Sequence, residues 1–159
     1  MDTSDILQTH KQLLFKVTKA FSNDRDEQKD LLQEIMIEIF KSIKAFRNES
    51  NIKTYLYRIA LNTCIRYSQK YHLNQQKVSI EAFEWDNIPD KNNESEKIEM
   101  LYTCISQLNE ADKSLVLLYL DDMNYKEIKE VTGLTENHIA VKMSRIREKL
   151  FICLTSKKL

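Results

Sequence analysis

Apolar residues recur at three- and four-residue spacing along most of the chain, which is typical of amphipathic helices. The predicted helices cover residues 4–21, 25–44, 52–70, 98–107, 110–121, 125–132 and 135–151. The 159 residues include one Gly and one Pro, so the tight turns of a hairpin-rich β fold lack the residues that they need. We therefore predict an all-α fold.

Residues 72–97 have no periodicity and contain the one Pro, several amides and a run of acids. A stretch of this length and composition predicts a flexible linker. We expect two small helical domains, at 1–71 and 98–159, on either side of it.

The predicted helix over 52–70 has an unusual distribution of side chains. One apolar face contains Leu56 and Ile59, and a second, nearly opposite face contains Tyr57 and Leu61, so we expect the helix to be wedged between others. A polar and aromatic stripe runs between these faces; it consists of Tyr55, Arg58, Asn62, Arg66 and Gln69. Aromatic rings among basic and amide groups suit unpaired bases, although tyrosines on a crowded helix are core residues in most proteins.

The last two predicted helices have the pattern of a helix-turn-helix. Asn124 and Glu127 fit a capping box, Gly133 marks the turn, and Thr135 caps the second helix. The predicted buried stripe of that helix is Ile139, Met143, Ile146 and Leu150. Its other side carries Asn137, Val141 and Arg145, which could contact base edges in a major groove. An ordinary helical hairpin is the alternative.

Charge is zero overall, with 24 basic and 24 acidic residues, but it is unevenly placed. Residues 41–78 carry eight basic side chains against Glu49 alone, a net charge of +7. Residues 135–159 carry six basic and two acidic side chains, a net charge of +4. Because phosphates are screened within about 10 Å, such local clusters favour nucleic-acid contact more than the total charge does. Solvated helix faces are the alternative explanation.

The sequence has no pattern typical of a disulfide framework, a catalytic site, a metal site or a membrane span. The three cysteines, Cys64, Cys104 and Cys153, have no paired spacing, so we expect reduced thiols in a cytoplasmic protein. No phosphate-binding loop, metal-ligand cluster or nucleophilic constellation is present, and we expect no catalytic residue, metal or cofactor. No apolar run approaches the roughly 20 residues of a membrane span, so we expect no membrane insertion.

Four segments together resemble a known family. They are Asp30–Glu34 (DLLQE), Phe46–Ser50 (FRNES), Thr54–Asn62 (TYLYRIALN) and the helix-turn-helix. In this order and at these separations they look like a bacterial RNA polymerase sigma factor of the extracytoplasmic-function (ECF) type, in the sigma-70 family. The resemblance covers nearly the whole chain outside 72–97.

The resemblance implies a role for each segment. The residues expected to contact the clamp coiled coil of core RNA polymerase are Asp30, Gln33, Glu34 and Ile37. The residues expected to bind the melted minus-ten element are Asn48, Glu49, Ser50, Lys53, Tyr55, Tyr57, Arg58, Asn62 and Arg66. The residues expected to contact the duplex minus-thirty-five element are Thr135, Asn137, His138, Val141, Lys142 and Arg145.

The resemblance also implies further partners and a mode of action. The helices before the recognition helix would dock on the flap of the polymerase β subunit, and the linker would run along the channel towards the active centre. An anti-sigma factor is a further candidate partner, and we expect a monomer when the protein is free. Tyr55 stands where the family usually has Trp, so a promoter sequence does not follow from the resemblance.

Three other function classes compete with this interpretation. The segment Tyr125–Leu150 also looks like the helix-turn-helix of response-regulator-type transcription regulators, which bind duplex DNA as dimers. That alternative leaves the motifs between 30 and 70 unexplained. An adaptor or anti-sigma role would account for the helices but not for the basic clusters, and an enzyme lacks a catalytic constellation.

Overall fold

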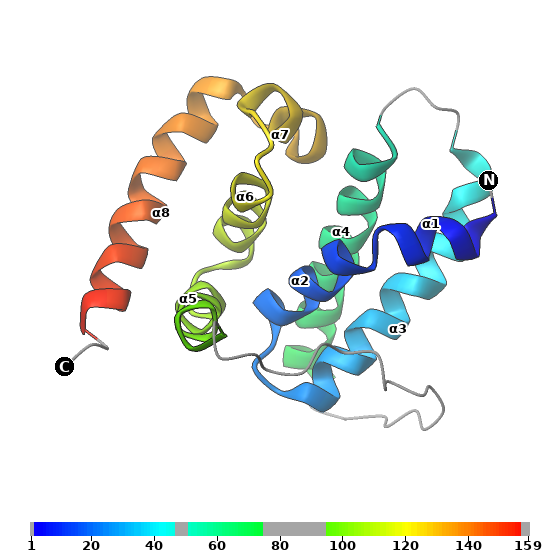
Figure 1. Ribbon diagram of the computed structural model, residues 1–159, viewed down its shortest axis with the longest axis horizontal. Helices are drawn as coiled ribbons and strands as arrows, with labels where there is room; N and C mark the ends of the chain where they lie inside the picture. Colours follow the sequence, from blue (N-terminus) through cyan, green and yellow to red (C-terminus); the bar gives the residue numbers. More distant parts are fainter. Residues whose placement is uncertain (1, 47–50, 75–94, 157–159) are drawn as a thin grey trace. The chain divides into compact units, whose positions relative to one another are not determined.

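The computed structural model describes residues 2–46, 51–74 and 95–156, and every regular element in these ranges is a helix (Figure 1). The chain divides into two compact units, Met1–Pro89 and Asp90–Leu159. The predicted all-α fold with two small helical domains is therefore confirmed. Most of the predicted linker lies outside the described residues, but its ends are helical, because one helix runs on to Asn74 and the next begins at Ser95.

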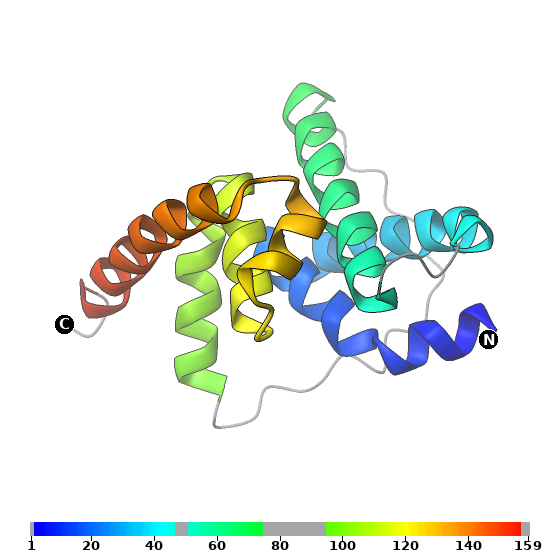
Figure 2. The ribbon, with the colours of Figure 1, turned by 90° about the horizontal axis from the view of Figure 1, so that it is seen from above.

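The N-terminal unit is built around three mutually packed helices. Its elements are α1 (Thr3–Thr9), α2 (Lys11–Phe21), α3 (Arg25–Ser42), a 3-10 turn η1 (Ile43–Ala45) and α4 (Ile52–Asn74). The helices α2, α3 and α4 contact one another in pairs. The short helix α1 precedes α2 and contacts it (Figure 2). Asp24 caps α3, because its side chain accepts a hydrogen bond of 3.1 Å from the Asp26 amide.

The helix predicted over 4–21 is divided at His10. The His10 backbone, with φ −108° and ψ 18°, leaves the helical region between α1 and α2. Just before it, the Thr9 hydroxyl donates to the Asp5 carbonyl at 2.8 Å, a contact of a kind that bends helices. Burial lowers the pKa of His10, and the positive charge of Lys53 lowers it further, so this ring loses its proton more readily than an exposed histidine.

Half of the circumference of α4 is buried. The buried side chains are Thr54, Leu56, Tyr57, Ala60, Leu61, Thr63 and Cys64. The two separate apolar faces predicted for this helix are thus one continuous surface, because Ala60 and Cys64 join them. Ile59 is predicted to lie on the first of these faces, and the same spacing predicts Ile65 on the second. Both side chains are partly exposed and flank the polar stripe instead.

The buried side of α3 is narrower than the sequence predicts. The apolar spacing over residues 25–44 predicts a buried stripe of Leu31, Leu32, Ile35, Met36, Ile39, Phe40 and Ile43. Leu31, Leu32, Ile35 and Ile39 are buried, whereas Met36 and Ile43 are partly exposed and Phe40 is 49% exposed. An edge helix with two packed neighbours buries only the stripe that faces them, and Phe40 lies outside that stripe.

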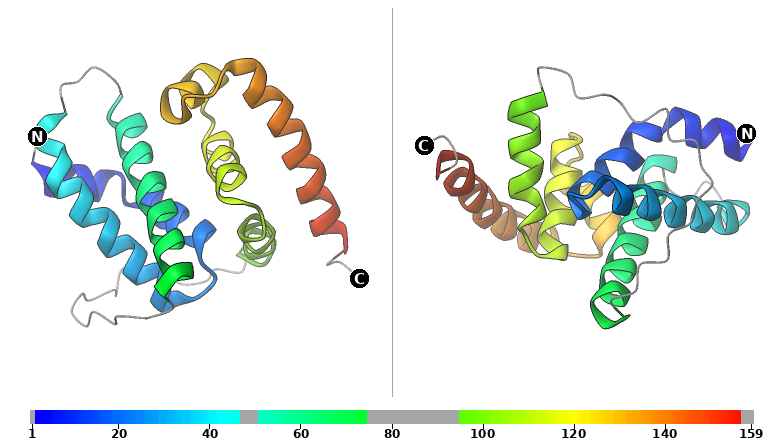
Figure 3. Two further views of the ribbon diagram at one scale, coloured as in Figure 1. Left: turned by 180° about the vertical axis from the view of Figure 1, so that it is seen from behind. Right: turned by 90° about the horizontal axis from the view of Figure 1, so that it is seen from below.

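In the C-terminal unit, the described residues 95–156 form four helices. They are α5 (Ser95–Ser106), α6 (Glu110–Leu120), α7 (Tyr125–Thr132) and α8 (Glu136–Ser156). The long helix α8 packs against each of the other three (Figure 3). Its predicted buried stripe is confirmed: Ile139, Met143, Ile146 and Leu150 are all buried.

The turn between α7 and α8 has the predicted chemistry. Asn124 and Glu127 form a capping box, with reciprocal hydrogen bonds of 2.8 and 3.0 Å. Gly133 ends α7 at φ +79°, where a side chain is disfavoured. The Thr135 hydroxyl then accepts a hydrogen bond of 3.2 Å from the amide of His138 in the first turn of α8.

The expectation of three reduced cysteines is wrong for two of them. Cys104 of α5 and Cys153 of α8 form a disulfide, with their Cα atoms 5.9 Å apart. The two residues are 49 positions apart in sequence, so their spacing gave no sign of the pairing. Cys64 is buried in the N-terminal unit.

Gly133→Ala should destabilise the C-terminal unit by about 1 kcal/mol, because the new methyl group has no neighbour within 4 Å and the cost is that of the left-handed backbone alone. Hydrogen exchange of the α7 and α8 amides measures this change. Asp122→Asn is the matched control, because Asp122 also has a positive φ of 59° and Asn tolerates it. Equal protection in Gly133→Ala and the original chain would contradict this account of the turn.

Candidate nucleic-acid interfaces

The polar stripe of α4 lies on the exposed half of the helix. Arg58, Asn62, Arg66 and Gln69 are all exposed, and they follow one another along the same side. The exposed side chains therefore combine guanidinium groups with amides, which can contact phosphate oxygens and base edges. The structure brings these predicted residues together on one surface.

A groove of about 470 Å³ lies beside this stripe, between α3 and α4. Its lining residues are Glu38, Ser42, Ile59, Asn62, Ile65 and Arg66. The two isoleucines provide apolar contact, and the other four side chains provide hydrogen-bonding groups. This mixture suits a flat, partly polar ligand such as a nucleobase. Glu38 and Ser42 were not among the predicted site residues, because they join the site only when α3 packs against α4.

Arg66 is held loosely at one side of this groove. Its Nη2 atom lies 3.6 Å from Oε2 of Glu38 and 3.5 Å from the Thr63 hydroxyl. The Arg66 side chain remains 62% exposed, and a solvent-exposed ion pair of this kind is weak. Arg66 can therefore exchange Glu38 for a phosphate at little cost.

Tyr55 is partly occupied by structural contacts at the start of α4. Its hydroxyl donates to the Ser42 carbonyl at 2.7 Å, and its ring lies against Phe46 with the centroids 4.7 Å apart. These contacts connect the beginning of α4 to the end of α3. The Tyr55 side chain therefore also has a structural role at this junction.

The prediction that Tyr57 contacts DNA does not agree with the structure. The Tyr57 side chain is 1% exposed and belongs to the core of the N-terminal unit. It is two positions from Tyr55, and two residues in a helix point roughly 200° apart, so both tyrosines cannot share one face. Lys53 is partly exposed in the first turn of α4, and its amide donates to the Asn51 side chain at 3.0 Å. Asn48, Glu49 and Ser50 lie outside the described residues.

The predicted partner-binding residues of α3 share one accessible side. Asp30, Gln33 and Glu34 are partly exposed, and Ile37 is 39% exposed. Phe40, three residues beyond Ile37, adds a large exposed ring to this side. The surface therefore combines acidic groups with two apolar side chains, which is typical of a protein interface.

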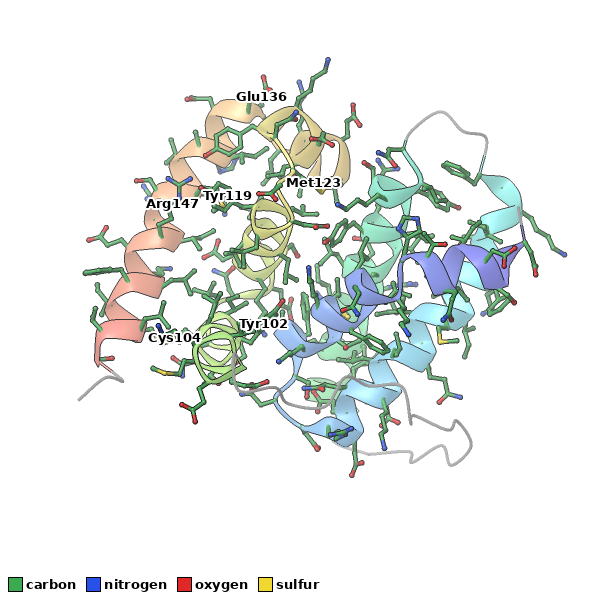
Figure 4. All side chains as sticks on the ribbon, viewed as in Figure 1. Tyr102, Cys104, Tyr119, Met123, Glu136 and Arg147 are labelled. Carbon is green, nitrogen blue, oxygen red and sulfur yellow. A yellow bond between two sulfur atoms is a disulfide. The ribbon has the colours of Figure 1, made fainter. Side chains whose placement is uncertain are left out.

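The recognition helix α8 presents its predicted residues to solvent. Asn137, His138, Val141 and Arg145 are exposed, Thr135 is exposed before the helix, and Lys142 is partly exposed. Further along α8, two exposed basic side chains contact α6. The Arg147 guanidinium lies 4.6 Å from the centre of the Tyr119 ring (Figure 4). Lys149 Nζ lies 3.7 Å from Oδ2 of the buried Asp112.

Comparison with known families accounts for both units. The family model for Sigma-70 region 2 matches residues 6–72, and the model for Sigma-70, region 4, matches residues 98–150. The chain belongs to the sigma-70 family, as an ECF sigma factor. It is therefore a factor that binds core RNA polymerase and gives it promoter specificity. The dimeric-regulator alternative is set aside, because it has no place for region 2.

Curated relatives of this sigma factor match along most of their length. The RNA polymerase sigma factor SigV of Bacillus subtilis (strain 168) is 26% identical over 152 residues, which are 94% of this chain and 89% of SigV. The ECF RNA polymerase sigma-E factor of Haemophilus influenzae (strain ATCC 51907 / DSM 11121 / KW20 / Rd) is 28% identical over 137 residues, covering 78% of this chain and 72% of that protein.

Two solved structures share the fold of this sigma factor. CnrH, solved in complex with the cytosolic domain of CnrY, gives a TM-score of 0.67 at 15% identity and covers 97% of this chain and 88% of CnrH. RpoE of Bartonella quintana, solved with the anti-sigma factor NepR, gives a TM-score of 0.68 at 18% identity. The match covers 95% of this chain and 97% of RpoE.

Two further findings concern the described part of the chain. None of its helices is long and apolar enough to cross a membrane. In the same residues, no three His, Cys, Asp or Glu side chains are grouped in a way that could hold a metal ion.

Tyr57→Ala should destabilise the N-terminal unit of this sigma factor by about 3–5 kcal/mol, because it removes a large buried side chain. Asn62→Ala, on the exposed half of the same helix, should change stability by less than about 0.5 kcal/mol. Urea unfolding followed by circular dichroism measures both variants. Comparable losses would mean that the exposed stripe is part of the packed core.

Proposed function

We propose that this sigma factor uses the exposed half of α4 to hold the melted minus-ten element. The observation that carries this proposal is the position of Arg58, Asn62 and Arg66 on one exposed surface beside the groove that Ile59 and Ile65 line. Stacking or apolar contact supplies about 1–3 kcal/mol per unpaired base, and extrusion of a base from the duplex costs a few kcal/mol. A groove that accepts one base, with arginines on the adjacent phosphates, therefore roughly balances the cost of melting.

We further propose that α3 binds the clamp coiled coil of the polymerase through Asp30, Gln33, Glu34 and Ile37. Their shared accessibility, and the exposed Phe40 next to them, support this assignment. In this arrangement α3 would contact protein and α4 would contact DNA, so one compact unit would couple polymerase binding to promoter melting. The residues from 1 to 71 would form this region 2 domain.

The C-terminal residues 98–159 would form the second, duplex-reading domain. Asn137, Val141 and Arg145 would lie in the major groove of the minus-thirty-five element, with Thr135, His138 and Lys142 beside them. The helices α5 to α7 would dock on the flap of the β subunit. Residues 72–97 would link the two domains and follow the polymerase channel.

The sigma factor would act by binding alone, without catalytic chemistry of its own and without a cofactor. Its place of action would be the cytoplasm, where the polymerase works. The structures of CnrH with CnrY and of RpoE with NepR suggest an anti-sigma factor as a further partner for this chain. Without its partners, the sigma factor would be a monomer.

Asn62→Ala combined with Arg66→Ala should reduce open-complex formation about tenfold and leave the affinity for core polymerase unchanged, because these side chains would contact DNA only. Permanganate reactivity of melted thymines and polymerase pull-down measure the two properties. Lys16→Ala, which removes an exposed positive charge from α2, is the control and should affect neither. Loss of both properties together would assign a structural role to the stripe.

Asp30→Ala combined with Glu34→Ala should weaken binding to core polymerase about tenfold, because the acidic side of α3 would lose its charge complementarity with the clamp. Asp2→Ala combined with Asp5→Ala makes the same charge change at the beginning of α1 and serves as the control. A titration of labelled sigma factor with core polymerase measures the affinities. If the α3 and α1 variants bind equally well, the assignment of α3 is wrong.

Two positions on α8 should separate sequence reading from phosphate contact. Asn137→Ala should reduce discrimination between promoter variants by a factor of about 5–150, because it removes a base contact of about 1–3 kcal/mol. Lys142→Ala should instead weaken binding uniformly and lower the slope of affinity against salt concentration by about one. Transcription by the holoenzyme on a set of minus-thirty-five variants, at several salt concentrations, measures both. Identical profiles for the two variants would contradict the proposed placement of α8.

A further inference from the structure

The disulfide between Cys104 and Cys153 connects the end of α5 to the last turns of α8. Cys104 is 2% exposed (Figure 4). The covalent loop between them includes all of α6 and α7 and most of α8. Every residue proposed to read the minus-thirty-five element is therefore enclosed by this one bond.

The last turns of α8 have few other contacts with the unit. Leu150 is the last buried residue of the helix, and Phe151 and Ile152 beyond it are 68% and 59% exposed. The ion pair of Lys149 with Asp112 lies before these turns begin. Cys153 and Leu154 are the partly buried side chains among residues 151–156, and the disulfide is the covalent connection of these turns to α5.

We propose that Cys104 and Cys153 are a reversible thiol–disulfide switch that sets the stability of the C-terminal unit. The reversible character rests on the proposed function, because a cytoplasmic disulfide in such a protein is usually transient. Formation of the bond by a low-molecular-weight disulfide proceeds in two exchanges. One cysteine thiolate displaces a small thiolate to form a mixed disulfide, and the second cysteine thiolate then displaces the other small thiolate. Two cysteine thiols are oxidised, one small disulfide is reduced to two thiols, and two protons pass from the cysteines to the released thiolates.

The unequal burial of Cys104 and Cys153 determines which cysteine reacts first. Cys153 is partly exposed, whereas Cys104 is almost fully buried, so exchange with a small molecule begins at Cys153 in both directions. The amide oxygen Oε1 of Gln107 lies 3.7 Å from Cys153 Sγ. In the reduced form this oxygen can accept a weak hydrogen bond from the Cys153 thiol. Cys64 belongs to the other unit and takes no part.

The disulfide affects α8 by raising the free energy of unfolding of the C-terminal unit. Closing a loop of about 50 residues restricts the unfolded chain, and reduction removes that restriction. The α8 helix carries Asn137 to Arg145 at one end and Cys153 at the other, so loosening its last turns lowers the barrier to unfolding of the whole helix. The oxidised sigma factor should therefore keep its duplex-reading surface at higher temperature than the reduced one.

Alkylation of the full-length sigma factor tests whether the bond forms. The protein is incubated in reduced or in oxidised glutathione, then unfolded and alkylated. Mass spectrometry should find three alkylated cysteines after reduction and one, Cys64, after oxidation. Hydrogen exchange of the α8 amides at increasing temperature measures the midpoint of thermal unfolding of the C-terminal unit. This midpoint should be about 10 °C higher in the oxidised form. Dithiothreitol should reverse both changes.

Two variants separate the bond from other effects of the buffers. Cys153→Ala should have the same midpoint in both forms of glutathione, close to that of the reduced original chain. Cys64→Ala should retain the full shift. Three alkylated cysteines after oxidation, a stable adduct of glutathione on Cys153, or a shift that persists in Cys153→Ala would each overturn the proposal. None of these readouts involves polymerase or DNA, so they fail or succeed independently of the proposed function.

Discussion

Packing of Leu56, Tyr57 and Leu61 against α2 and α3 determines which residues of α4 reach the solvent. Because this helix buries one continuous half of its circumference, the opposite half is fixed in direction along its length. Arg58, Asn62, Arg66 and Gln69 lie on that opposite half. The apolar core thus orients the polar surface, and a DNA strand that contacts the first of these residues also meets the others in line.

The second unit follows the same principle. The buried stripe of α8 fixes the helix on α5, α6 and α7 and leaves its outward side exposed, as the proposed contact with base edges in a major groove requires. The sharp turn at Gly133 and the caps at Asn124 and Thr135 define where α8 begins. The first turns of the recognition helix therefore have a definite position, which reading a base sequence requires.

Most helices, the caps and the exposure of the α4 stripe could be predicted from the sequence, because each depends on residues close together in the chain. Two errors have a common cause. The exposure of Phe40 and the pairing of Cys104 with Cys153 depend on which neighbours a helix meets in three dimensions. The α3–α4 groove was missed for the same reason, since Glu38 and Ser42 come from a different helix than Asn62. The burial of Tyr57 agrees with its predicted place on an apolar face of the helix, and only the DNA contact implied by the family resemblance is wrong.

In the proposed function, one chain reads single-stranded DNA with α4 and duplex DNA with α8. Photocrosslinking in the complete polymerase complex tests this most directly, with a photoreactive amino acid at position 62 or at position 141. On a promoter found by run-off transcription, position 62 should crosslink to the minus-ten element only after melting, and position 141 should crosslink to the minus-thirty-five duplex before and after it. Crosslinking of position 62 to closed duplex, or of neither position to promoter DNA, would contradict the account.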